Sequence, residues 1–138
     1  MSDANNARVG QIFHDAQFIR LLGIELISFG EGWCESRVNV SPNLQQQHGF
    51  IHAGVLMTLA DHTCGGAAAS MVAEDRDVLT VETKTSFFRP ASGSILLCRA
   101  EVLRAGRSLI FVEAEVKASE DNRLVAKASS TLAVVARR

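Results

Sequence analysis

The segment HGFIHAGVLMTLADH, from His48 to His62, carries the strongest structural signal in the chain. Its middle part, residues 55–60, is apolar on nearly every side of a helix, and such a helix belongs in a protein core. The apolar spacing continues and predicts a central helix from Ala53 to about Val72. Asp61 interrupts this run, although burying an unpaired carboxylate costs on the order of several kcal/mol. The segment therefore predicts a fold built around one helix, and Asp61 needs a separate explanation.

The rest of the chain predicts a sheet around that helix. Residues 24–29 and 33–40 read as two strands joined by a glycine-rich turn, and residues 11–22 as a short amphipathic helix. From Val78 onward apolar and polar residues alternate, which is typical of a half-buried antiparallel sheet. The apolar positions of this alternation are Leu79, Val81, Phe87, Ile110, Val112, Ala114 and Val116. The expected class is α+β, with about six antiparallel strands wrapped around one long helix.

Length and composition limit the classes of function. The chain has 138 residues, of which 47% are hydrophobic and 21% charged, so we expect one globular domain spanning residues 1–138. The formal net charge of -1 provides no field for nucleic acid or an anionic membrane. A small molecule or another protein is therefore the expected partner.

The sequence also bears on compartment and cofactors. The N-terminus, MSDANNARVG, lacks the apolar run of a signal peptide, and no apolar stretch approaches the roughly 20 residues that cross a bilayer. Cys34, Cys64 and Cys98 are too few and too far apart for a disulfide framework or a C-x-x-C metal site, so we interpret them as reduced core residues. We expect a cytoplasmic protein with no membrane contact, no metal and no other cofactor.

Asp61 has no local cation to pair with. The positions three and four residues away on the helix hold Met57, Thr58, Cys64 and Gly65. A salt bridge within the helix is therefore not available. The pair Gly65-Gly66 costs a helix about 0.8 to 1.0 kcal/mol per glycine relative to alanine. This cost indicates that a ligand or another backbone comes close to the helix beside Asp61.

The start of the same helix offers a complementary group. Gly49 and Gly54 permit tight backbone paths, and the first amides of the helix, near Ala53, present N–H groups at the positive end of the helix dipole. Such amides can hold a developing oxyanion, while an acid further along acts as base or nucleophile at the carbonyl carbon. The segment therefore predicts acyl-transfer chemistry that uses Asp61.

Two motifs carry a family resemblance. One is H-x-G-x-x-x-x-L-A-D, from His52 to Asp61, and the other is the strand TVETKTSFFRP, from Thr80 to Pro90. Together with Gly106-Arg107 and the closing strand LVAKA, they make residues 21–135 similar to the hotdog-fold acyl-CoA thioesterases. The phenylacetyl-CoA-pathway and 4-hydroxybenzoyl-CoA branches resemble the chain most. The resemblance implies the hotdog fold and hydrolysis of an acyl-CoA thioester to free acid and CoA.

The resemblance also implies site residues. It assigns the catalytic carboxylate to Asp61 and the carbonyl-polarising amide to Ala53, where the family usually has glycine. Gln46 takes the place of a family amide that touches the thioester or the attacking water. Thr80 takes the place of a hydroxyl that the neighbouring subunit contributes. Whether the carboxylate attacks the thioester to form an anhydride or acts as a base toward water stays open.

Other residues complete the expected site. His52 is expected to orient it and Gly54 to lie against the substrate, whereas His48 and His62 are interpreted as structural hydrogen-bonding residues. Cys64 lies in apolar helix without an activating base, so thiol catalysis is not expected. Three arginines at strand ends either bind the CoA phosphates or are simply solvated, namely Arg89, Arg104 and Arg107.

The acyl group and the reaction have open alternatives. Phe50, Trp33 and Met57 either line an aromatic or medium-chain pocket or belong to the core. The chain is alternatively a hotdog dehydratase or hydratase, although that branch typically has prolines near a histidine before the helix and this loop has only Pro42. It is alternatively an acyl-CoA-binding protein that does not hydrolyse its ligand.

We expect a homo-oligomer, either a dimer or a dimer of dimers. A sheet that wraps one helix leaves strand edges free, and pairing with a second copy covers such an edge. The resemblance implies in addition that the helix of Asp61 and the strand of Thr80 complete one site only when different subunits contribute them.

Overall fold

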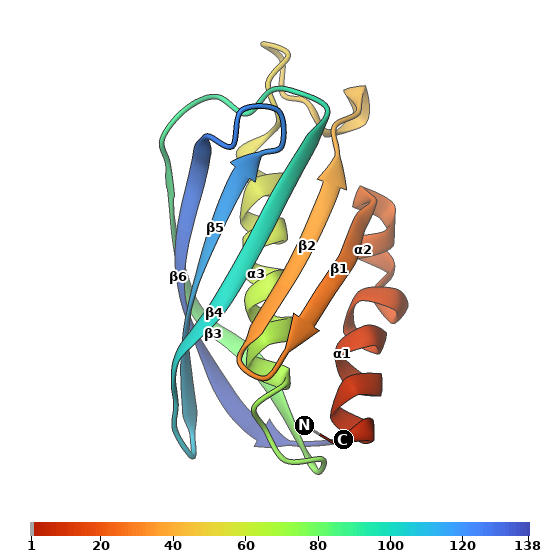
Figure 1. Cartoon of the computed structure of the whole chain (residues 1–138), viewed down its shortest axis with the longest axis vertical. Helices are drawn as coiled ribbons and strands as arrows, with labels where there is room; N and C mark the ends of the chain where they lie inside the picture. The colour runs from red at the N-terminus through yellow and green to blue at the C-terminus, as the bar shows by residue number, and fades with distance from the viewer. Residues whose placement is uncertain (1) are drawn as a thin grey trace.

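The structure, a computed structural model, describes residues 2–138 as a six-stranded antiparallel sheet wrapped around one long helix, α3 (Figure 1). The strands lie in the order β1-β2-β4-β5-β6-β3. The helices are α1 (Asp3–Asp15), α2 (Gln17–Leu22), the short 3-10 helix η1 (Pro42–Leu44) and α3 (Ala53–Ala69). The strands are β1 (Ile24–Gly30), β2 (Trp33–Asn39), β3 (Arg76–Phe87), β4 (Ile95–Ala105), β5 (Leu109–Ala118) and β6 (Leu124–Ala136). This arrangement confirms the predicted class and the single central helix.

The central helix α3 packs against the concave face of the sheet. Its buried side includes Leu59, which is fully enclosed. A side chain at Gly66 would begin 2.8 Å from Cys34 Sγ and 3.1 Å from the Phe13 ring, so glycine there lets β2 and α1 come close. Gly65, by contrast, faces open space. The close approach that the glycine pair predicted is thus made, at Gly66, by β2 and α1 of the same chain. Within residues 2–138 no helix has both the length and the hydrophobicity needed to cross a membrane.

The N-terminal helical region differs from the prediction. One helix was expected at residues 11–22, but α1 begins at Asp3 and the chain breaks at Ala16 before α2. The early turns of α1 are polar and therefore carry no apolar periodicity; Ser2 Oγ caps them by accepting the Asn5 N–H at 3.1 Å. Ala16 has extended backbone angles, which redirect α2 along β1. Gly23, with φ +76°, ends α2 where the sequence predicted a stop.

Arg8 of α1 caps the far end of α3. Its guanidinium group donates hydrogen bonds to the main-chain oxygens of Ala69 at 2.9 Å, Val72 at 3.0 Å and Ala73 at 3.1 Å. Two further bonds reach the Arg76 carbonyl and the Asn5 side chain. Only 5% of Arg8 is exposed, and burial lowers its pKa. One cation therefore bonds several carbonyl groups at and just after the end of α3, which ties α1 to this end of the helix.

We predict that Arg8→Met lowers the free energy of unfolding by about 2 kcal/mol, because methionine keeps an apolar stem but removes the side-chain donor to the Ala69 carbonyl oxygen and one of the donors to Val72 and Ala73. Urea unfolding followed by circular dichroism measures this change. Arg20→Met, at an exposed position on α2, is the matched control and should change stability by less than about 0.5 kcal/mol. Equal stability of both variants would contradict the capping role.

The alternation predicted for β3 is wrong, whereas that of β5 is confirmed by its buried Ile110, Val112, Ala114 and Val116. In β3, Leu79 and Val81 are 62% and 64% exposed. Thr80 pairs with the buried Leu132 and Thr83 with the buried Ser130, so both threonines face α3. The cause is a register shift between Thr80 and Glu82, which inserts an extra residue and resets the two-residue period. The bulge therefore lines the face of β3 beside Asp61 with hydroxyl groups.

Candidate active site

The N-terminal end of α3 presents a free amide at the surface. His52 is the N-cap, and its Nδ1 accepts the Gly54 N–H at 2.8 Å. A side chain at Gly54 would begin 3.0 Å from that nitrogen, so glycine leaves room for the cap. The preceding amide, that of the exposed residue Ala53, finds no acceptor within residues 2–138. His52 thus caps the helix start and leaves one N–H available.

A groove of about 530 Å³, which we call the amide groove, surrounds this N–H. Gln46, Leu56 and Arg89 line it together with Ala53. The Gln46 Oε1 atom accepts the His48 N–H at 2.5 Å and the Phe50 N–H at 3.3 Å, which fixes the loop before α3. Because that oxygen is occupied, the side-chain NH₂ group of Gln46 is the part left to donate into the groove.

Asp61 lies two turns further along α3 in a second groove. This groove of about 410 Å³, which we call the acid groove, is lined by Ala16, Phe18, Ile19, Met57, Thr58, Asp61, His62 and Thr83. Asp61 is half-buried, and its Oδ1 accepts a hydrogen bond from Thr80 Oγ1 at 2.7 Å. None of the salt bridges formed by residues 2–138 involves Asp61. The carboxylate is therefore held by a hydroxyl group and not neutralised by a cation.

The contact between Thr80 and Asp61 corrects one expectation. The sequence resemblance placed the two residues in different subunits, but they meet here within one chain. Thr80 faces α3 because it pairs with the buried Leu132 of β6. A homo-oligomer therefore cannot be argued from this pair, and any need for a second copy has to come from other residues.

The predicted site residues form two groups in one chain. Eight residues separate Ala53 from Asp61, which corresponds to about 12 Å along a helix and about 80° around it. Arg89 lines the amide groove, whereas Arg104 and Arg107 lie at the β4–β5 hairpin, at the opposite end of the sheet (Figure 1). The hairpin end is tied to the end of α3, because Val102 N bonds Gly32 O and Gly32 N bonds Ser70 Oγ.

Comparison with known proteins identifies the family. Residues 48–125, more than half of the chain, match the family model of the thioesterase superfamily. The chain belongs to this superfamily. The matched region contains the amide groove's helix start, Asp61 and Thr80. The protein is accordingly a thioester hydrolase with the hotdog fold, as the sequence resemblance implied.

Three similar proteins agree with this assignment. A thioesterase family protein from Silicibacter pomeroyi is 35% identical, with a TM-score of 0.92 over 96% of this chain and 98% of that one. A Haemophilus influenzae thioesterase structure is 25% identical, with a TM-score of 0.85 over 94% of this chain and 90% of that one. The 1,4-dihydroxy-2-naphthoyl-CoA hydrolase of Listeria monocytogenes is 26% identical, covering 85% of this chain and 94% of its own length.

His62 and the cysteines of this thioesterase are structural, as predicted. His62 Nε2 lies 2.9 Å from the Ile12 carbonyl oxygen, and its ring meets Phe13 edge-on with centroids 4.7 Å apart. Burial lowers the pKa of His62, so the neutral ring is favoured. Cys34, Cys64 and Cys98 are buried and free. Burial raises the pKa of Cys64 to about 12, which excludes a thiolate nucleophile near neutral pH.

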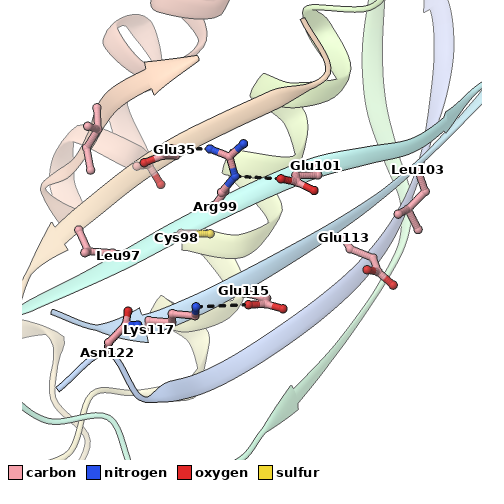
Figure 2. Close-up of a pocket in the computed structure, with 12 residues that line it drawn as sticks. Glu35, Leu97, Cys98, Arg99, Glu101, Leu103, Glu113, Glu115, Lys117 and Asn122 are labelled. Atoms are coloured by element: carbon pink, nitrogen blue, oxygen red, sulfur yellow. Dashed lines mark hydrogen bonds and ion pairs between the residues drawn. The ribbon is translucent and has the colours of Figure 1, made fainter. Parts of the chain in front are cut away.

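A further groove of the thioesterase lies on the outer face of the sheet, away from α3 (Figure 2). Its charged side chains pair with one another, as Arg99 does with Glu35 and with Glu101. The Arg99 guanidinium group also lies 4.6 Å from the centre of the Trp33 ring. Trp33 therefore belongs to this outer face and does not line a pocket with Asp61. None of the predicted catalytic residues lines the groove.

Sequence reasoning missed two residues around Asp61. Phe18, from α2, and Thr83, from β3, both line the acid groove. Phe18 falls outside the apolar stripe of its helix and is 58% exposed, so an aromatic residue off the stripe was the available signal. Thr83 gave no signal, because its orientation depends on the bulge in β3.

Proposed function

We propose that this thioesterase hydrolyses acyl-CoA thioesters with Asp61 as general base or nucleophile and the Ala53 amide as the carbonyl-polarising group. The observation that carries the proposal is the state of Asp61. Asp61 is a half-buried carboxylate on an apolar helix, without a cation and aligned by Thr80 at 2.7 Å. Such a group lowers the stability of the fold, and a catalytic role explains why it is kept. Thioester hydrolysis, the activity of the superfamily that residues 48–125 match, needs a base or a nucleophile of this kind.

Each group has a defined task in the reaction. As base, Asp61 removes a proton from water while the water oxygen bonds to the thioester carbon. As nucleophile, its own oxygen forms that bond and water later cleaves the resulting anhydride. In both routes the carbonyl oxygen becomes an oxyanion that the Ala53 N–H stabilises, and collapse breaks the carbon–sulfur bond. CoA leaves as a thiolate that then takes up a proton, and both routes need Asp61 ionised.

The proposed site requires two copies of the chain. One thioester carbonyl cannot touch both the Ala53 amide and the Asp61 carboxylate of one helix, since about 12 Å of helix separates them. A second copy with α3 antiparallel would bring its Asp61 to the amide groove of the first. Two features favour such packing. Within residues 2–138, β3 pairs only with β6 and exposes Leu79 and Val81. Gly65, one turn after Asp61, faces open space.

A direct assay tests the proposal. The protein is incubated with acyl-CoAs of several chain types, and released CoA thiol is measured with DTNB. Release of CoA from at least one substrate is expected. Binding without release would support an acyl-CoA-binding protein, and a change in the acyl chain without release would support a dehydratase or hydratase. Either result would refute hydrolysis of these thioesters as the function.

We predict that Arg89→Ala raises KM more than it lowers kcat. Arg89 lines the amide groove and is assigned to the CoA phosphates, which are remote from the reacting carbonyl, so it would bind them equally in the ground and transition states. Arg37→Ala, at an exposed position on β2, is the control and should leave KM unchanged. Steady-state kinetics measures both. Arg104→Ala and Arg107→Ala should raise KM only if a second copy supplies these residues to the site, and an unchanged KM for Arg89→Ala would remove that residue from it.

A further inference from the structure

The walls of the acid groove include large apolar side chains that are exposed. Phe18 from α2 and Met57 from α3 leave 58% and 41% of their surface exposed, although both are large and apolar. Both line the groove that holds Asp61, with the buried Ile19 beside them. Large apolar side chains exposed together around a concave surface are typical of a binding site for an apolar group.

The hydroxyl groups in the same groove are already engaged. Thr58 Oγ1 donates to the Gly54 carbonyl oxygen at 2.8 Å, and Thr83 Oγ1 accepts from Ser130 Oγ at 2.9 Å. Thr80, which is not part of the groove lining, donates its hydroxyl hydrogen to Asp61 Oδ1. The hydroxyl groups of the groove and His62 Nε2 therefore have partners within the chain, and beside the Asp61 carboxylate the walls offer mainly apolar contact.

The reaction geometry connects this groove to one half of the substrate. Because Asp61 has to lie near the thioester carbon, either in contact or through one water, one of the two groups bonded to that carbon lies along the acid groove. The CoA arm carries amide and phosphate groups, for which the acid groove has no arginine or lysine, whereas the amide groove that the second copy would bring to Asp61 has Arg89. The acyl group is thus the part of the substrate that meets Phe18 and Met57.

We propose that the acid groove binds the acyl group and that Phe18 and Met57 select for a bulky apolar one over acetyl. This inference rests on the proposed thioester hydrolysis. An acetyl group ends one carbon beyond the carbonyl and gains little from these walls. An aromatic ring or a medium-length chain covers the Phe18 ring and the Met57 side chain, and both side chains also make favourable contacts with aromatic rings.

The test compares kcat/KM for acetyl-CoA, hexanoyl-CoA and benzoyl-CoA in three proteins. Wild type should prefer hexanoyl-CoA or benzoyl-CoA, and the better of these identifies an aliphatic or an aromatic acyl group. Phe18→Ala should lower kcat/KM for that substrate by about tenfold and for acetyl-CoA by less than about twofold, since lost apolar contact acts only on the group that makes it. Leu21→Ala is the control, because Leu21 lies on the same helix, is 79% exposed and lines a separate groove.

Each other outcome has a defined meaning. Equal loss on all substrates, or an altered sedimentation coefficient of Phe18→Ala, would assign Phe18 to folding or association and overturn the proposal. If Phe18→Ala keeps the wild-type ratio of kcat/KM between the preferred substrate and acetyl-CoA, the proposed role of Phe18 would be overturned too. The proposed hydrolysis would still stand. Absence of CoA release by wild type would instead refute the proposed function. If Phe18→Ala fails to fold, Met57→Ala tests the opposite wall, with the same selective loss expected.

Discussion

Asp61→Asn should lower kcat by a factor of about 10² to 10⁴, the range typical of a positioned general base. Asparagine keeps the shape of the side chain and an oxygen that can accept the Thr80 hydrogen bond, but it can neither take a proton from water nor attack a carbonyl carbon. Substrate binding should survive, because the amide groove is unchanged. DTNB kinetics measures the loss, with Asp15→Asn, at an exposed position of α1, as the control.

The stability of the same variant distinguishes catalysis from structure. Asp61 has no cationic partner within residues 2–138, so neutralising it leaves no buried charge unpaired. The melting temperature should therefore stay the same or rise, as expected where a costly group is kept for function. A buried ion pair would instead lose about 3 to 5 kcal/mol on breaking. A folded Asp61→Asn protein with near wild-type turnover would refute the catalytic role.

Ala53→Pro should lower kcat by a factor of about 10² to 10³, the cost of removing one oxyanion-hole donor. Proline deletes the N–H and nothing else from the hydrogen-bond network, because the Ala53 amide has no acceptor within residues 2–138. The first position of a helix is where proline is best tolerated. His52, with φ -62° and ψ 137°, already has the extended backbone that precedes proline. The fold should therefore be retained.

Ala53→Val is the matched control for added bulk. Valine keeps the N–H and places branched carbon atoms in the amide groove, so it should retain most of the activity that proline loses. Circular dichroism checks that both variants keep α3. Equal turnover of the proline and valine variants would show that the Ala53 amide takes no part in the reaction.

The two inactive variants together test the two-copy site. In a dimer of one Asp61→Asn chain and one Ala53→Pro chain, one site would receive an intact Asp61 and an intact Ala53 amide from different chains. Random pairing of co-expressed variants should then restore about one quarter of wild-type activity, because half of the dimers are mixed and each has one working site of two. A site contained in one chain would show no recovery, and that result would contradict the proposed dimer.

Local patterns predicted the parts of the fold that depend on neighbouring residues in the chain. The apolar run of α3, the alternation of β5 and the glycine stop at Gly23 are all short-range signals, and all are confirmed. The interpretation of His62 as structural and of the cysteines as core residues followed from their apolar surroundings. These features could be predicted because side-chain period and burial are coupled within one helix or strand.

The predictions that failed depend on residues far apart in the sequence. The early part of α1 is held by Arg8, whose main-chain acceptors lie more than 60 residues away. The alternation in β3 is broken by a bulge that exists only in its pairing with β6. No pattern within either segment records these partners, because a capping bond and a register shift are properties of two segments together.

The sequence by itself determined that this chain has one central helix with a carboxylate on it, and that the helix begins with an amide and a capping histidine. Only the tertiary structure decided what surrounds that carboxylate. It brings the Thr80 hydroxyl to Asp61 within one chain, places Phe18 in the acid groove and separates Arg104 and Arg107 from the amide groove. The physical reason is that the sequence of a helix sets which side chains it carries and on which face. Packing of β3 and α2 against that helix sets which atoms come into contact.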